Sequence, residues 1–226
     1  MGGSELDDEV FWKLTSHKRF TTKSCYLALE CDVFGPNYKW LWKAKIPLKI
    51  QIFMWQVMQN AILTRDNMRK RKWAGNPLCS FCDQLETKSH LFFECASAKV
   101  VWGCIGSVLH TNSYPSSIWQ CFAWFYAFWP GGAKFYALIM LAVCWAIWTT
   151  RNKITFKGYK LRSPISIVFT VCSFLKYWAG MYKAEDKMAI RMGADYLIQK
   201  TMVVARQDGT SSSATRASGC LLITHT

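Results

Sequence analysis

Three cysteines and one histidine lie close together in the stretch CSFCDQLETKSHLFFEC, at Cys79, Cys82, His90 and Cys95. Thiolate and imidazole are ligands that zinc prefers, and two cysteines separated by two residues can turn toward the same ion. The segment DQLETKS between the cysteine pair and the histidine is polar, which is typical of an exposed loop. The spacing therefore predicts a zinc site. The alternative is a chance cluster of four side chains in a reduced core.

The expected ligand set decides what kind of zinc site this is. Four protein ligands fill a tetrahedral site and leave no position for water or substrate, so we expect one structural Zn²⁺ and no catalytic residue. The free energy of zinc binding would then stabilise a loop that has little core of its own. The remaining histidines are expected at the surface; they are His17, His110 and His225.

The overall charge favours an anionic partner. The chain of 226 residues carries 28 Lys and Arg against 14 Asp and Glu, a formal net charge of +14. Such a balance favours nucleic acid first and an anionic membrane surface second, against the alternative of a solvated basic surface with no ligand. The polar N-terminal sequence MGGSELDDEV is unlike a signal peptide. We therefore expect reduced cysteines and a location in the nucleus or cytoplasm.

The pattern of apolar residues predicts a mainly α-helical fold. Residues 10–22 are expected to form a short N-terminal β-hairpin that runs into a helix at 23–30. The apolar stretch 135–148 is shorter than the roughly 20 residues that cross a bilayer, so a buried helix is expected there rather than a membrane span. Further helices are expected at 47–61, 65–73, 96–109, 118–129, 133–156, 163–186 and 186–205.

The metal motif and its flanks resemble a known family. The spacing C-x2-C-x7-H-x4-C follows the sequence WKAKIPLKI, and Thr64, Asn67 and Arg71 fall where the family has T-x-x-N-L-x-x-R, with Met68 replacing the usual leucine. SHLFFEC at 89–95 is also close to the family form, and CWAIWTTRNKITF at 144–156 resembles the segment that follows it. Residues 10–160 thus resemble the zinc-binding domain that follows the reverse transcriptase in plant LINE-type retrotransposons.

The resemblance implies three parts. They are a reverse-transcriptase-type zinc-binding domain at 10–106, a helical connector at 107–205 and a tail at 206–226, which its Ser/Thr/Gly-rich composition predicts to be disordered. A polymerase needs paired aspartates for magnesium, and the adjacent pair Asp7-Asp8 lies in the polar N-terminal segment. We also expect no room for the carboxylates of a ribonuclease H domain. The sequence therefore predicts a non-catalytic, retrotransposon-derived protein, not an enzyme.

A basic segment interleaved with tryptophan precedes the metal motif. Between positions 39 and 72 the one acidic residue is Asp66. Basic side chains can bind phosphates and exposed indoles can stack on bases without reading a sequence, so we expect RNA or DNA to bind here. The alternatives are a solvated helix face and buried tryptophans. The candidate nucleic-acid-binding residues are Lys43, Lys45, Lys49, Arg65, Arg69, Lys70, Arg71, Lys72 and Trp73.

A protein-interaction scaffold is the rival function. In that case the zinc would only fix a loop, and an apolar surface would bind a protein partner or a second copy. The residues expected to form that surface are Phe122, Trp124, Phe125, Phe128 and Trp129.

Overall fold

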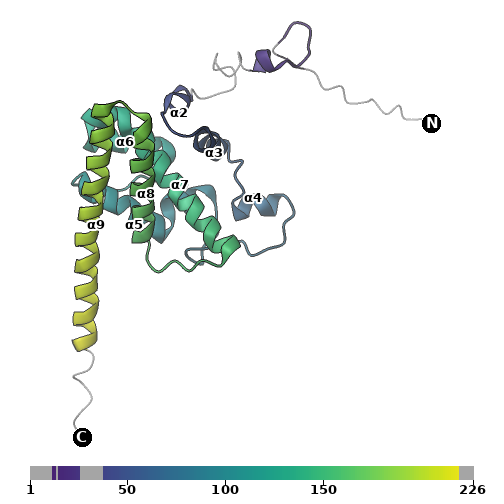
Figure 1. Ribbon diagram of the computed structural model, residues 1–226. Helices are drawn as coiled ribbons and strands as arrows, with labels where there is room; N and C mark the ends of the chain where they lie inside the picture. Colours follow the sequence, from purple (N-terminus) through teal and green to yellow (C-terminus); the bar gives the residue numbers. More distant parts are fainter. Residues whose placement is uncertain (1–11, 14, 26–37, 219–226) are drawn as a thin grey trace. The chain divides into compact units, whose positions relative to one another are not determined.

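The computed structural model describes residues 12–13, 15–25 and 38–218, with side chains up to 206 (Figure 1). The chain divides into two compact units, Met1–Trp40 and Leu41–Thr226.

In the described part of the first unit, a tight loop replaces the expected hairpin. The backbone N–H of Trp12 donates to the carbonyl of Lys18 at 2.9 Å, and the N–H of Lys18 donates to Thr15 at 3.0 Å. Lys18 has a left-handed φ of 53°, so the chain turns here and does not continue as a paired strand. No strand occurs at residues 12–13, 15–25 or 38–218, so the predicted β-hairpin is wrong.

A capping box explains why the chain leaves the extended conformation. The N–H of Ser24 donates to Oγ1 of Thr21 at 3.0 Å, and the N–H of Thr21 donates to Oγ of Ser24 at 3.2 Å. This reciprocal pair satisfies backbone groups at a helix start. The helix begins at residue 22 and is described up to residue 25; the rest of the helix expected at 23–30 lies outside the described residues.

The second unit is helical, as the apolar pattern predicts, and most of its helices follow the expected ranges within a few residues. The helix expected at 163–186 ends at Trp178, and the helix expected at 186–205 extends to Ser218. A first short helix, α2 (Lys39–Lys43), spans the boundary between the units. The later elements are α3 (Leu48–Met58), α4 (Arg65–Lys70), the π-helix η1 (His90–Glu94), α5 (Ala96–Val108), α6 (Ile118–Phe128), the 3₁₀ turn η2 (Pro130–Gly132), α7 (Ala133–Lys157), α8 (Ile165–Trp178), the 3₁₀ turn η3 (Ala179–Met181) and α9 (Ala184–Ser218).

Helix α7 is the central element of the second unit. It packs against α8, which in turn packs against α9, and it also contacts α3, α6 and η1 (Figure 1). Phe53 of α3 meets Trp145 of α7 edge-to-face, with ring centroids 5.0 Å apart. The stretch Pro130–Lys157 is long and apolar enough to cross a membrane, but 61% of its most apolar window is buried inside the fold. This burial is typical of a core helix.

Helix α9 extends further than the sequence pattern suggests. It runs to Ser218 and so continues into the segment 206–226 that was expected to be a disordered tail. Residues 219–226 lie outside the described part of the chain. The boundary expected at residue 106 stays a prediction.

Candidate metal centre

The loop that carries Cys79 and Cys82 is closed by backbone hydrogen bonds. The N–H of Cys79 donates to Gln84 at 2.7 Å, and the N–H of Glu86 donates to Pro77 at 3.1 Å. Between these bonds lies an isolated antiparallel bridge that joins Leu78 to Leu85. The N–H of Phe81 points at Sγ of Cys79 from 3.5 Å, as expected for a C-x2-C turn whose amides face the sulfurs. The bridge places both thiols on the same side of the loop.

A π-turn brings the other two ligands together. His90 and Cys95 are five residues apart, which in an α-helix would be about one and a half turns and would point them in different directions. Instead, the N–H of Cys95 donates to the carbonyl of His90 at 2.7 Å, and His90–Glu94 forms a π-helix. An i→i+5 bond widens the turn by one residue. The two side chains therefore face the same point.

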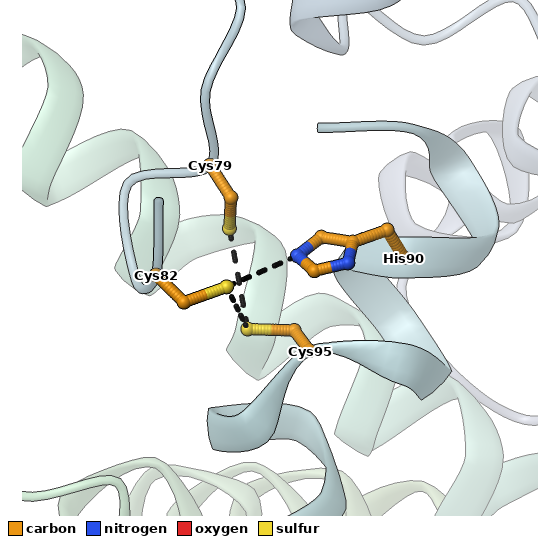
Figure 2. Close-up of side chains that lie close together, drawn as sticks. All are labelled: Cys79, Cys82, His90 and Cys95. Atoms are coloured by element: carbon orange, nitrogen blue, oxygen red, sulfur yellow. Dashed lines mark hydrogen bonds between the residues drawn. The ribbon is translucent and has the colours of Figure 1, made fainter. Parts of the chain in front are cut away.

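All four side chains converge, as Figure 2 shows. Sγ of Cys82 lies 3.2 Å from Nε2 of His90 and 3.5 Å from Sγ of Cys95, and the sulfurs of Cys79 and Cys95 are 4.0 Å apart. The four potential ligand atoms all lie within 4.8 Å of one another. Ligands at about 2.3 Å from a tetrahedral zinc are separated by roughly 3.8 Å, so the cluster has the dimensions of one zinc site.

Burial and hydrogen bonding shift the pKa values of the potential ligands in different directions. Burial lowers the pKa of His90, which favours the neutral imidazole that a metal requires. A hydrogen bond to Cys95 and burial raise the pKa of Cys79 well above the ordinary thiol value. The pKa of Cys95 is lowered because it accepts that hydrogen bond. Zinc binds thiolates, so metal binding here must displace protons from the cysteines.

A buried ion pair joins the metal loop to helix α7. Glu86 is 0% exposed and Arg151 is 1% exposed. The guanidinium of Arg151 donates to Oε1 of Glu86 through one terminal nitrogen at 2.6 Å and to both carboxylate oxygens through Nε at 3.1 and 3.2 Å. Such a pair is stable only if the remaining donors are satisfied. Here the second terminal nitrogen donates to Asn152 at 2.9 Å, so the requirement is met.

Further hydrogen bonds extend this network to α4 and to the end of α7. The guanidinium of Arg65 donates to Ser80 at 2.8 Å and to the carbonyl of Asn76 at 3.1 Å. Its backbone N–H donates to Glu86 at 3.0 Å. The hydroxyl of Ser80 lies 2.9 Å from that of Thr155 in α7. The metal loop is thus held between α4 and α7.

The family-like residues before the motif have identifiable structural roles. Asn67 is buried, and its amide donates to the carbonyls of Asn60 at 2.7 Å and Ile62 at 3.0 Å, which closes the loop between α3 and α4. Thr64 stands at the N-cap of α4, but its hydroxyl bonds the carboxylate of Asp66 and makes no cap bond to the backbone. The motif T-x-x-N therefore positions α4 beside the metal loop.

The basic residues expected to bind nucleic acid are spread over several elements. Lys43 ends α2, Lys45 follows it and Lys49 is in α3, and all three are exposed. The run Arg69, Lys70, Arg71, Lys72 and Trp73 is also exposed, with Trp73 at 41%. Arg65 differs, because its side chain is only 13% exposed and is used within the fold. The structure brings the four metal ligands into one site but not the nine basic and aromatic residues.

Sequence reasoning did not identify Glu86 and Arg151 as partners. One signal was available for Arg151, which is the first charged residue after a long apolar run within a core helix. A charge in such a place needs a buried counter-ion. Nothing in the polar segment DQLETKS distinguished Glu86 from an exposed acid.

Comparison with known proteins finds a family match for the segment that contains the metal cluster. Residues 20–102 match the family model described as zinc-binding in reverse transcriptase. The resemblance to a retrotransposon-type zinc-binding domain is thereby confirmed for this segment. The matched segment contains all four clustered ligands, so the family description and the geometry of the cluster agree on one zinc ion.

A curated Arabidopsis thaliana protein named "Putative ribonuclease H protein" is 27% identical over 101 residues. The matched stretch is 42% of this chain, and it spans only 16% of that relative's length. No solved structure matches the chain.

Proposed function

We propose that this protein is a non-catalytic, zinc-stabilised module that binds nucleic acid through the exposed run at the end of α4. The run consists of Arg69, Lys70, Arg71, Lys72 and Trp73 and is called the α4 run below. It directly precedes the metal loop, so the zinc site and the ion pair behind it would keep its base rigid. Phosphates would bind the cations, and the indole would offer a stacking surface.

The observation that carries this proposal is the exposure of four consecutive cations beside a rigid loop. Among the residues that the structure describes, the one ion pair of the run joins Lys70 to the carboxylate of Asp66 at 3.5 Å, so acidic side chains neutralise little of its charge. Trp73 lies against Gly75, where even a Cβ atom would come within 1.9 Å of the indole. Gly75 therefore allows the ring to lie flat on the turn with 41% of its surface exposed.

The test is a binding titration of the zinc-loaded protein with labelled single-stranded RNA and DNA. Replacing Lys70 and Lys72 with glutamate should weaken binding by about tenfold or more in dilute salt, because each phosphate contact is replaced by repulsion. The matched control is Lys187→Glu with Arg191→Glu on α9, which makes the same change in net charge. Equal losses in both variants, or no binding by the unaltered protein, would contradict the proposal.

A scaffold function is the second candidate, favoured by the outer face of α6. Trp119 is 53% exposed and Tyr126 is 68% exposed, and their spacing of seven residues places both on one face of the helix. Two residues of the surface expected from the sequence, Trp124 and Phe125, are instead buried in the core. A scaffold would self-associate or bind a protein through Trp119 and Tyr126, and the α4 variants would leave that binding unchanged.

A further inference from the structure

A second basic and aromatic surface lies at the carboxyl end of α7, outside the segment that matches the family model. It consists of six exposed residues, called the α7 patch below: Lys153, Phe156, Lys157, Tyr159, Lys160 and Arg162. Phe156 is 71% exposed, although phenylalanine is among the residues most often buried, and Tyr159 is 44% exposed. Within one helix turn the patch offers both charge and stacking surface.

The sequence on both sides of the patch has no acidic residue over a long stretch. Between Glu94 and Glu185 the sequence has no aspartate or glutamate. Within the part of the chain that the structure describes, none of the four cations of the patch forms an ion pair. The local field is therefore positive, and an anionic partner is favoured over a neutral or basic one.

The patch is held in place by the metal domain. Thr155, on the opposite side of the same helical turn, bonds Ser80 of the metal loop, and Arg151 one turn earlier forms an ion pair with Glu86. The guanidinium of Arg151 also lies 5.9 Å from the ring centre of Phe156, a cation–π contact that restrains this exposed ring. A ring that is already restrained loses little conformational entropy when a base stacks on it.

The end of α7 turns the patch into a continuous surface. Gly158 has a left-handed φ of 63° and ends the helix, and the N–H of Tyr159 then donates to the carbonyl of Lys153 at 3.2 Å. This turn folds Tyr159 and Lys160 back toward the last helical turn. Lys153, Phe156 and Lys157 have the i, i+3, i+4 spacing of one helix face.

We propose that the α7 patch binds a single-stranded nucleic acid, with its cations on phosphates and with Phe156 and Tyr159 stacked on unpaired bases. The proposal rests on the proposed function, because it names a second surface for the same kind of ligand. Single strands are favoured over duplex because paired bases offer no free face to the two rings. The zinc loop would then lie between two basic surfaces, the α4 run on one side of Ser80 and the α7 patch on the other.

The experiment measures binding of the zinc-loaded, full chain to a labelled single-stranded oligonucleotide of 20 residues and to a duplex of the same length. Lys157→Ala with Lys160→Ala should weaken single-strand binding by about tenfold and flatten the logarithmic salt dependence by about 1.4. The matched control, Lys187→Ala with Arg191→Ala on α9, should change affinity by less than about twofold, because its contribution is only the net charge.

The two rings are tested separately from the charges. Phe156→Leu keeps the apolar contact but removes the stacking face, and it should weaken single-strand binding by about fivefold or more. Duplex binding should change by less than twofold, and Phe156→Trp should restore single-strand binding. Circular dichroism and zinc content, unchanged in each variant, exclude loss of fold as the cause.

The outcomes separate this inference from the proposed function. Loss of binding in the α4 variants alone overturns the inference and leaves the proposed function standing. Loss in the α7 variants alone supports the inference and moves the binding surface away from the α4 run. Absence of binding by the unaltered protein overturns both. Equal losses in the α7 variants and the α9 control overturn the inference, because they show attraction by net charge without a site.

Discussion

The three cysteines of the metal cluster differ from the cysteines of the helical core in their surroundings. Cys144 and Cys121 are buried in helices of the core, where burial raises the pKa of each thiol well above its ordinary value. Such thiols stay protonated and act as small apolar side chains. Cys82 is only half buried and has three potential ligand atoms around it. A ligand cysteine is therefore distinguished from a core cysteine by the potential ligand atoms around it. In the sequence, the spacing of the motif is the feature that indicates this difference.

Removing one ligand should remove the metal. Cys82→Ser should reduce zinc from about one per chain to nearly none, because a hydroxyl is a poor ligand for a site built of thiolates. Elemental analysis of protein purified without chelator gives the stoichiometry. The control is Cys144→Ala, which should lose some stability by leaving a small cavity but retain its zinc. A folded Cys82→Ser protein with full zinc content would contradict this ligand set.

The buried pair of Glu86 and Arg151 should contribute strongly to stability. Glu86→Gln leaves the guanidinium of Arg151 buried without its counter-charge, and loss of one partner of such a pair costs about 3–5 kcal/mol in the free energy of unfolding. Adding Arg151→Met to Glu86→Gln should recover part of that loss, since the unpaired charge is then gone. Urea denaturation of the zinc-loaded protein measures both variants.

The exposed pair of Lys176 and Asp195 is the matched control for this effect. Their side chains are 39% and 58% exposed, so water and salt screen the interaction. Asp195→Asn should therefore change the free energy of unfolding by at most about 1 kcal/mol. Similar losses in the free energy of unfolding for Glu86→Gln and Asp195→Asn would show that the buried pair stabilises the fold no more than an exposed pair does.

At the level of elements, helices were predictable from the sequence and the connections between them were not. The apolar spacing of α3 marks its buried face and the long apolar run marks α7, while Pro47 precedes α3 and Gly132 and Gly158 flank α7. The π-turn at His90–Glu94 could not be predicted, because nothing in HLFFE separates an i→i+5 bond from an ordinary helical one. The π-turn brings His90 and Cys95 together, whereas a regular α-helix would point these two side chains in different directions. The N-terminal hairpin failed for a related reason: the Thr21 and Ser24 capping box overrides a weak alternation.

Helix α9 contains a glycine whose replacement should stabilise the fold. Gly193 lines a cavity of about 400 Å³ whose walls come from the helices α5 to α9. A Cβ atom added at Gly193 would meet nothing within 4 Å. Gly193→Ala should raise the free energy of unfolding by about 1 kcal/mol, because alanine is the better helix former. Thermal unfolding measures the change.

Gly103 in α5 supplies the comparison for this substitution. A Cβ atom there also meets nothing within 4 Å, but Gly103 does not line the cavity. Gly103→Ala should therefore show the helix-propensity gain alone. Because an added Cβ atom meets nothing within 4 Å at either position, the two gains should be about equal. A loss at Gly193 with a gain at Gly103 would show that the glycine is needed for the packing of α9.

For the molecule as a whole, the basic charge and the zinc site could be predicted from the sequence. The contact between the metal loop and α7 could not. The excess of basic residues, the reduced cysteines and the ligand spacing are properties that a list of residues contains. The link from Glu86 to Arg151 spans 65 positions and depends on α7 returning to the metal loop, which no local pattern encodes. For the same reason the α7 patch, next to the loop in space, was not recognised beside the basic segment at 39–72.

Salt dependence tests whether the positive charge acts through defined contacts. If four or five exposed cations neutralise phosphates, the logarithm of the association constant should fall with the logarithm of salt concentration with a slope of about −3 to −4.5. Lys70→Ala with Lys72→Ala should flatten that slope by up to two contacts, or about 1.4–1.8. Trp73→Ala should weaken single-strand binding more than duplex binding and leave the slope unchanged, because stacking releases no counterions. A salt-independent affinity, or a slope unchanged in the lysine variant, would reject the α4 run as a binding surface and favour the scaffold function of α6.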